Sequence, residues 1–214
     1  GMKVAFSRYS SHVSTDQDVS RSEIGTVGRP RDPIKHQAVV RATRELLDEE
    51  GFGGATVAAI ARRAGVGTPT IYRRWPRRED LIEDAALGAE SESLPEPTGD
   101  LTDDISAWTE LFLRRLADPV TRAALPGLLA AYHHEPGRYE QLVARFEADV
   151  RESFAAMVAS DTGVDQDRAV DVDTIFSMLV SSTLARALTF GLDDADDFRD
   201  RTVAALVTLV RARD

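Results

Sequence analysis

The sequence predicts an all-α protein, and three observations support this prediction. Apolar residues recur at spacings of three and four in one segment after another, which is the period of an amphipathic helix. No stretch of the chain alternates apolar and polar residues as a half-buried β-strand does. Short breaks that contain Gly, Pro or Asp separate the periodic segments. With 214 residues, 43% of them apolar, the chain is long enough to fill a sizeable core.

Four short helices are expected in the N-terminal part of the chain. Asp32, Thr56 and Thr68 are suitable N-caps, and Pro33 fits a first helical position. Gly51 suits the left-handed residue that ends a helix. The predicted helices cover 33–51, 57–64, 68–75 and a stretch that begins near residue 78.

Five further helices are expected after a linker at 91–100, which has two prolines and one glycine. Their predicted ranges are 101–117, a stretch through 125–132, 139–159, 170–190 and 198–211. Residues 3–27 are polar and lack a helical period. We therefore predict a disordered tail over 1–27, a first domain over 28–90 and a second over 91–214.

The composition excludes several classes of protein and site. The chain has no cysteine, which excludes disulfides, thiolate metal sites and cysteine redox chemistry. No run of about 18 apolar residues occurs, so neither a transmembrane helix nor a membrane partner is expected, and a cytoplasmic location is predicted. We find no Ser/His/Asp set, phosphate-binding glycine loop or paired-carboxylate motif, so no enzyme and no cofactor are expected.

The charge of the chain is unevenly distributed. The net charge is −10, yet residues 28–80 hold 11 Lys and Arg against 7 Asp and Glu, a net charge of +4. Electrostatic interactions act locally, within a Debye length of roughly 8–10 Å. An acidic protein with this basic segment is therefore compatible with a polyanionic partner such as DNA, although a solvated basic face is the simpler explanation of charge alone.

Two short helices joined by the three residues 65–67 form the pattern of a helix-turn-helix. The second helix of that motif lies in the major groove of DNA. At 100° per residue, Ile71 and Trp75 fall on one side of the 68–75 helix, and we expect them to pack against the 57–66 segment. The polar and cationic residues between them then point outward.

The outward side chains have the chemistry of DNA recognition. Arg73 can offer two parallel donors to guanine or hold a phosphate. Arg77 and Arg78 lie at a helix start, where backbone N–H groups favour an anion. Arg29 and Arg31 precede the first helix and are suited to a narrow minor groove. The predicted DNA-binding residues are Arg29, Arg31, Thr56, Thr68, Thr70, Tyr72, Arg73, Arg74, Arg77 and Arg78.

The segment "ATVAAIARRAGVGTPTIYRRWPRREDLIEDA" closely resembles the DNA-binding domain of the tetracycline-repressor (TetR) family of bacterial regulators. The resemblance extends from about Val39 to Ala86, and its elements occur together at the spacing of the family. The chain departs from the family pattern at Trp75, which is more often Phe, at Arg74, which is often His, and at Arg77, which is often Ser or Asn.

The resemblance implies about nine helices, a homodimer and a palindromic double-stranded DNA operator. It also implies that the C-terminal domain has a cavity for a small-molecule effector and dimerises through its last two helices. The interface residues expected on those helices are Ile175, Met178, Leu179, Ser182, Ala185, Arg186, Val203, Leu206, Val207 and Val210.

Aromatic and neighbouring residues of the second domain are the candidates for the effector site, with core packing as the alternative for each. They are Trp108, Phe112, Leu129, Tyr132, His133, Phe146, Met157 and Phe176. The adjacent His133 and His134 would point in different directions on a helix, so no metal site is expected.

The predicted function is that of a sequence-specific DNA-binding transcriptional regulator, a repressor that a small-molecule effector releases from its operator. One alternative is a regulator that activates transcription or responds to a protein partner. Another is a helical small-molecule carrier or enzyme in which the basic segment is incidental.

Overall fold

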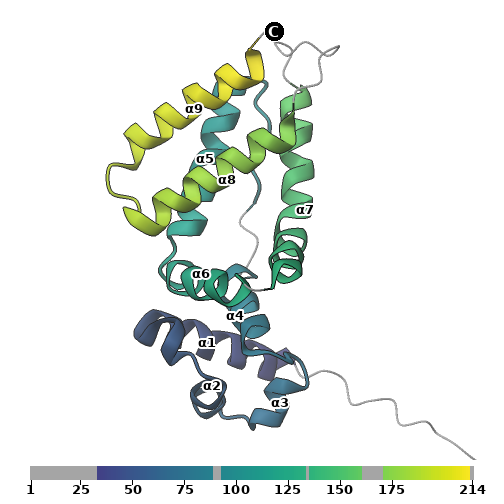
Figure 1. Ribbon diagram of the computed structural model, residues 1–214, viewed down its shortest axis with the longest axis vertical. Coiled ribbons are helices and arrows are strands. Elements are labelled where there is room, and N and C mark those ends of the chain that lie inside the picture. The colour runs from purple at the N-terminus through teal and green to yellow at the C-terminus, as the bar shows by residue number, and fades with distance from the viewer. Residues whose placement is uncertain (1–32, 89–92, 134, 161–170, 213–214) are drawn as a thin grey trace, which may run out of the picture. The chain divides into compact units, whose positions relative to one another are not determined.

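Nine helices and no strand are found in the described part of the chain, which confirms the predicted all-α class (Figure 1). The computed structural model describes residues 33–88, 93–133, 135–160 and 171–212. The helices are α1 Pro33–Gly54, α2 Val57–Ala64, α3 Thr68–Tyr72, α4 Arg78–Leu87, α5 Leu101–Ala117, α6 Pro119–Tyr132, α7 Pro136–Ser160, α8 Val172–Thr189 and α9 Ala195–Arg211. The predicted tail and the start predicted at residue 170 lie outside the described residues.

The buried apolar residues form two cores within the unit Pro33–Asp214. The first, here called the N-terminal core, consists of residues of α1–α4 and α6, of Ala55 and Trp75 between these helices, and of Leu142 of α7. The second, the C-terminal core, consists of residues of α5, α7, α8 and α9. The N-terminal core includes helices from both sides of the linker, because α6 follows the linker in sequence yet packs against α1 and α4.

The long helix α7 contributes to both cores. Leu142 lies in the N-terminal core, and Phe146 packs against it. Further along the same helix, Phe154, Met157 and Val158 lie in the C-terminal core. One continuous helix of 25 residues therefore joins the two cores.

Several boundaries differ from the prediction, and each difference has a local cause. α3 ends at Tyr72 rather than Trp75, because Pro76 disfavours helical geometry at the residue before it. Gly67, not Thr68, is the N-cap of α3 and makes no side-chain cap. α7 and α9 each begin three residues early; α9 has Asp196 and Asp197 in its first turn, where acidic side chains interact favourably with the helix dipole.

Two glycines permit the close packing at the end of α1. Gly51 has φ 70° and ψ −172°, a combination that is essentially restricted to glycine. This confirms the predicted left-handed residue, and a short helical turn follows it up to Gly54. Gly127 of α6 faces Phe52 so closely that an added Cβ would clash with the ring.

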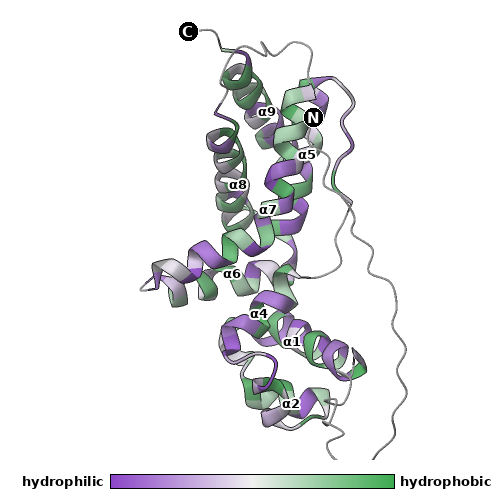
Figure 2. Ribbon diagram, turned by 90° about the vertical axis from the view of Figure 1, so that its right-hand side faces the viewer, coloured by the Kyte–Doolittle hydropathy of each residue, from purple (hydrophilic) through white to green (hydrophobic). Residues whose placement is uncertain are grey.

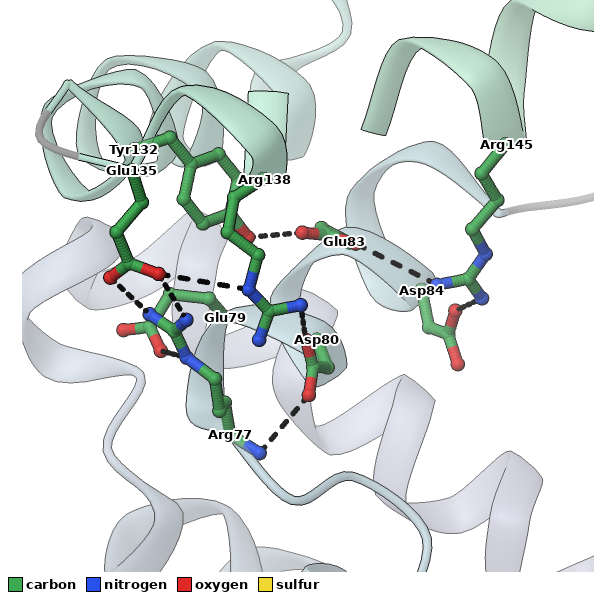
Figure 3. Close-up of polar contacts among 9 residues, drawn as sticks. All are labelled: Arg77, Glu79, Asp80, Glu83, Asp84, Tyr132, Glu135, Arg138 and Arg145. Atoms are coloured by element: carbon green, nitrogen blue, oxygen red, sulfur yellow. Dashed lines mark hydrogen bonds and ion pairs between the residues drawn. The ribbon is translucent and has the colours of Figure 1, made fainter. Parts of the chain in front are cut away.

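Polar contacts connect α4 to the end of α6 and to α7 (Figure 3). Asp80 accepts from the backbone N–H of Arg77 at 3.1 Å and pairs with Arg138 at 3.4 Å. Arg145 pairs with Asp84 and, at 3.6 Å, with Glu83. The α4–α7 polar cluster, as we call it, comprises Arg77, Glu79, Asp80, Glu83, Asp84, Tyr132, Glu135, Arg138 and Arg145.

Glu83 is the buried carboxyl of this cluster. The Tyr132 hydroxyl donates a hydrogen bond to it. Burial raises the pKa of Glu83 above its ordinary value, although the Tyr132 hydrogen bond and the positive charge of Arg145 oppose the rise. Burial and the same hydrogen bond raise the pKa of Tyr132, so the phenol remains the donor.

The geometry of Gly51 predicts an unequal response of two neighbouring glycines to alanine. Gly51→Ala should lower the free energy of unfolding by about 1–3 kcal/mol, because alanine is strained at this φ and ψ. Gly53 is the matched control, since an added Cβ meets nothing within 4 Å, and Gly53→Ala should be neutral or stabilise by up to about 1 kcal/mol. Urea unfolding measures both values. Equal losses would contradict this account.

The raised pKa of Glu83 predicts a pH dependence of stability. In the unfolded chain this carboxyl titrates near its ordinary 4.5, whereas the folded chain keeps the proton to a higher pH. The folded state therefore binds more protons in that window, and this group's contribution to stability falls as the pH rises through it.

Glu83→Gln keeps an acceptor for Tyr132 and removes the titration. The unfolding free energy of the parent relative to this variant should fall as the pH is raised above 4.5, as measured by urea unfolding at a series of pH values. Glu110→Gln, at an exposed carboxylate of α5, controls for the loss of one acidic group. Parallel curves for the parent and Glu83→Gln would refute the prediction.

Candidate nucleic-acid interface

The end of α2 and the start of α3 form a sharp turn with well-defined caps. The Thr56 hydroxyl accepts a hydrogen bond from the backbone N–H of Ala59 at 3.2 Å and caps α2. Gly65 ends α2 in the left-handed region, with φ 65° and ψ 34°. α3 begins three residues later, at Thr68. This is the geometry of the helix-turn-helix that the sequence predicts.

Two buried apolar residues, one on α3 and one in the segment that follows it, hold the inward side of this region. The side chains of Ile71 and Trp75 are 1% and 4% exposed and lie in the N-terminal core, as predicted. The Trp75 indole N–H donates to the Asp84 carboxylate at 2.6 Å. The His36 ring of α1 stacks on the indole, with the ring centroids 5.3 Å apart. Burial and the charge of Arg74 lower the pKa of His36, which favours the neutral ring.

The outward side of α3 and of the two residues that follow it presents polar and cationic groups. Tyr72 is 50% exposed, Arg73 and Arg74 are exposed, and Thr70 is partly exposed. The Arg73 guanidinium makes no ion pair with any of the described residues. The Arg74 guanidinium lies 5.3 Å from the centroid of the Trp75 ring. Thr68 is partly exposed at the first position of the helix.

Sequence reasoning missed one cation on this part of the molecule. Arg62, in the last turn of α2, is exposed and has no ion pair within the described ranges. Its neighbour Arg63 is instead paired with Glu49 at 2.8 Å. Helical spacing could have identified Arg62, because it lies four residues after the exposed Ala58 and away from the buried Ile60.

Arg77 and Arg78 have partners inside the chain, which argues against their assignment to DNA. Both terminal nitrogens of Arg77 donate to Glu135, at 2.8 and 3.2 Å, and this pairing raises the pKa of Arg77. Arg78 donates to the Phe52 carbonyl oxygen at 3.2 Å, and its guanidinium carbon lies 4.2 Å from the centroid of the Phe52 ring. Arg29 and Arg31 lie outside the described residues.

The predicted effector-site residues do not form one group. Trp108, Phe112, Met157 and Phe176 lie in the C-terminal core. Tyr132 belongs to the N-terminal core, where Phe146 packs against it. Leu129 is partly buried and His133 is exposed.

Phe154 was not predicted, yet it lies among the aromatic residues of the C-terminal core. Its ring centroid is 5.4 Å from those of both Trp108 and Phe176. The Trp108 indole nitrogen is buried and has no hydrogen-bond partner among the described residues.

Five predicted interface residues are packed inside the chain, which argues against their contact with a second copy. Ile175, Leu179, Val203, Leu206 and Val210 are at most 5% exposed and belong to the C-terminal core. α8 is apolar on more than one side and α9 is amphipathic, so helical spacing identified apolar sides but not whether α5 or a second copy covers them.

The remaining predicted interface residues are partly or fully exposed. Met178 and Ala185 are exposed, whereas Ser182, Arg186 and Val207 are intermediate. Leu209, which was not predicted, is 42% exposed. Figure 2 shows how much of α8 and α9 is hydrophobic.

Metal and membrane sites were searched in the described ranges. They contain no group of three or more His, Asp or Glu side chains arranged to hold a metal ion. None of their helices is long and apolar enough to cross a membrane.

Two family models match the chain and together cover most of it. Residues 39–85 match the model for bacterial regulatory proteins of the tetR family. Residues 95–206 match the model for the tetracyclin repressor-like C-terminal domain.

Individual relatives agree with the family models. The chain is 30% identical over 176 residues to the DNA-binding transcriptional repressor TetR of Mycobacteroides abscessus, covering 77% of this chain and 88% of the relative. It is 43% identical over 79 residues to the uncharacterized HTH-type transcriptional regulator YdeS of Bacillus subtilis. That match spans 36% of this chain and only 40% of YdeS.

The fold is also similar to solved structures. The multidrug binding protein EbrR, solved in complex with imidazole, aligns over 90% of this chain and 99% of its own with a TM-score of 0.56 and 16% identity. The matched family models, the repressor from M. abscessus and the helix-turn-helix geometry agree, and the chain belongs to the TetR family of bacterial transcriptional regulators.

Proposed function

We propose that this regulator is a repressor that reads operator DNA with the exposed side of α3 and is released by a small molecule bound in the C-terminal core. One observation supports this proposal best. Ile71 and Trp75 are buried on one side, whereas Tyr72 and Arg73 are exposed on the other, and Arg73 has no ion pair within the described residues. A side chain held by internal ion pairs would have to break them to reach DNA, and Arg73 has none to break within the described residues.

The proposed DNA surface comprises the exposed or partly exposed polar residues of α2 and α3. Arg73 has the donor geometry for guanine, and Arg74 and Arg62 are suited to phosphates. Thr56 lies at the N-terminus of α2, where backbone N–H groups favour an anion. The full set is Thr56, Arg62, Thr68, Thr70, Tyr72, Arg73 and Arg74, with Arg29 and Arg31 as further predicted contacts.

We propose that the effector binds among the aromatic residues of the C-terminal core. Trp108, Phe112, Phe154 and Phe176 offer apolar contacts, and the unpartnered indole N–H of Trp108 offers one buried donor. A buried donor without a partner costs about 1–3 kcal/mol, so a ligand with a suitably placed acceptor would recover that cost. Multidrug binding by EbrR, a protein of the same fold, supports a ligand site in this domain.

A carrier or enzyme remains the rival class, and no feature of the described residues favours it. Membership in a family of transcriptional regulators and the helix-turn-helix geometry both favour DNA binding.

Homodimerisation is proposed through the sides of α8 and α9 that the C-terminal core leaves exposed. On α8 the exposed residues include Met178, Ser181 and Ala185, which recur at three and four. On α9 they include Ala205 and Leu209. Small side chains permit close helix approach, and a two-fold protein fits a palindromic operator.

The DNA contact is tested by comparing two arginines on a duplex recovered with the parent protein from a random-sequence pool. Arg73→Ala should weaken binding to this duplex by about 1–3 kcal/mol and binding to a scrambled duplex by less, with unchanged stability. Arg78→Ala should instead lower the unfolding free energy by about 1–2 kcal/mol, because it loses both contacts with Phe52.

A salt titration completes that experiment. Arg78→Ala should leave the slope of log affinity against log salt unchanged. A slope shallower by about one unit, without loss of stability, would instead identify Arg78 as a phosphate contact. Failure of the parent to recover any duplex, or full affinity in Arg73→Ala, would overturn the proposed role of α3.

The dimer proposal is tested by placing charges on the exposed and buried sides of α8. Met178→Asp should give a folded monomer at micromolar concentration by sedimentation equilibrium, because it puts an unpaired charge into an apolar contact. Leu179→Asp should instead unfold the chain, since Leu179 is fully buried. Tyr139→Asp, at an exposed aromatic residue of α7, should remain dimeric. A dimeric Met178→Asp variant would exclude this surface.

A further inference from the structure

The carboxylate of Asp84 is shared by two groups from different parts of the chain. Its Oδ2 atom accepts the indole N–H of Trp75 at 2.6 Å. Its Oδ1 atom accepts from the Arg145 guanidinium of α7. Trp75 comes two residues after Arg73, and Asp84 lies on α4. A single side chain therefore connects the segment that follows α3 to α7.

Each of the three side chains is constrained by further contacts. Trp75 is 4% exposed and is stacked by His36. Asp84 has a side chain that is 19% exposed. Arg145 is half-exposed, but it also pairs with Glu83 at 3.6 Å and lies over the Phe146 ring, 5.0 Å from the centroid. The Trp75 indole and the Arg145 guanidinium thus both donate to the Asp84 carboxylate, and we call this pair of contacts the Asp84 bridge.

The bridge joins α3 to a helix that also belongs to the C-terminal core. Arg145 precedes Phe154 by nine residues on α7, a distance of about 13 Å along the axis at 1.5 Å per residue. Phe154 is fully buried against Trp108 and Phe176. A rotation or translation of α7 around Phe154 would therefore move the Arg145 end of the same helix and its contact with Asp84.

A second α4–α7 ion pair provides a comparison. Arg138 of α7 pairs with Asp80 of α4 at 3.4 Å and with Glu135 at 3.8 Å. It holds the same two helices together, but neither Asp80 nor Glu135 contacts α3 or Trp75 in any described hydrogen bond. The Arg138 pair thus reaches Arg77 but not the Trp75 indole or its acceptor, whereas the Arg145 pair ends on the acceptor of the Trp75 indole.

We propose that Trp75, Asp84 and Arg145 are positioning residues for DNA binding, and that α7 sets the position of the recognition helix α3 through the Asp84 bridge. This inference rests on the proposed function, because it assigns DNA contact to α3. Packing of the core needs only the ring of Trp75, whereas the bridge needs its N–H. Trp75→Phe separates the two roles, since it keeps an aromatic ring and removes the donor.

The first experiment observes the bridge without DNA. In the full chain labelled with ¹⁵N-tryptophan, the two tryptophans give two indole N–H cross-peaks, and the peak lost in Trp75→Phe belongs to Trp75. Arg145→Gln should shift this peak and speed its hydrogen exchange by about fivefold or more, because the carboxylate loses its cationic partner. The Trp108 peak is the internal control and should not move. Arg138→Gln should leave both peaks in place.

The second experiment measures affinity for the duplex recovered with the parent protein. Trp75→Phe and Arg145→Gln should each weaken binding about fivefold to twentyfold. The double variant should bind no more weakly than the weaker of the two single variants, because both substitutions remove the same bridge. Trp75→Phe combined with Arg138→Gln should show only the effect of Trp75→Phe. Circular dichroism and urea unfolding verify that the variants are folded.

The outcomes separate this inference from the proposed function. An unmoved Trp75 peak in Arg145→Gln overturns the bridge, even if the parent binds its duplex tightly. Additive losses in the double variant overturn the positioning role and leave two independent packing effects. If the parent recovers no duplex, the proposed function fails, and the positioning role fails with it, whatever the Trp75 peak shows.

Discussion

Burial of two side chains positions the recognition helix, and the candidate interface depends on that burial. α3 has five residues, whereas isolated helices shorter than about 12–15 residues are marginal in water. Its geometry therefore comes from its neighbours: Ile71 and Trp75 enter the N-terminal core, and Gly65 ends α2 sharply before it. Because Ile71 and Trp75 are buried, the polar residues between them face outward. A loss of packing beneath α3 would change the DNA surface without altering any residue on it.

The N-terminal core is not confined to the helices that precede the linker. α6 packs on α1 and α4, and its Gly127 leaves room for the Phe52 ring. Leu142 of α7 also lies in this core. The linker therefore separates two stretches of sequence without separating two independent cores. This arrangement suits the proposed regulation, because a displacement of α6 or α7 by a bound ligand would act directly on the helices that support α3. Coupling between the two sites then requires no long path, only a helix that belongs to both cores.

Local signals predicted the helices well and the roles of single side chains less well. Caps and glycines act within a few residues, so Thr56, Gly51 and the bounds of α2 could be identified from the sequence. The partners of Arg77 could not, because Glu135 lies 58 residues further along the chain. α8 is apolar on more than one side and α9 is amphipathic, so periodicity located both helices but not which neighbour covers their apolar sides. The same limit applies to the predicted effector residues, since Phe146 and Met157 lie on one helix, yet Phe146 packs against the N-terminal core and Met157 lies in the C-terminal core.

The distribution of partners among the arginines explains how an acidic chain can present a DNA surface. Residues 28–80 carry a net charge of +4, but much of that charge is used internally: Arg63 pairs with Glu49, Arg77 with Glu135, and Arg78 packs on Phe52. Such pairs support the scaffold and leave few cations for an external polyanion. Arg62 and Arg73 are exposed and unpaired within the described residues. Within the described residues, the proposed DNA surface thus offers Arg62, Arg73 and Arg74, to which the predicted contacts Arg29 and Arg31 would add. If the protein binds DNA as the proposed dimer, each copy would contribute these cations, and the interface between copies would become part of DNA recognition.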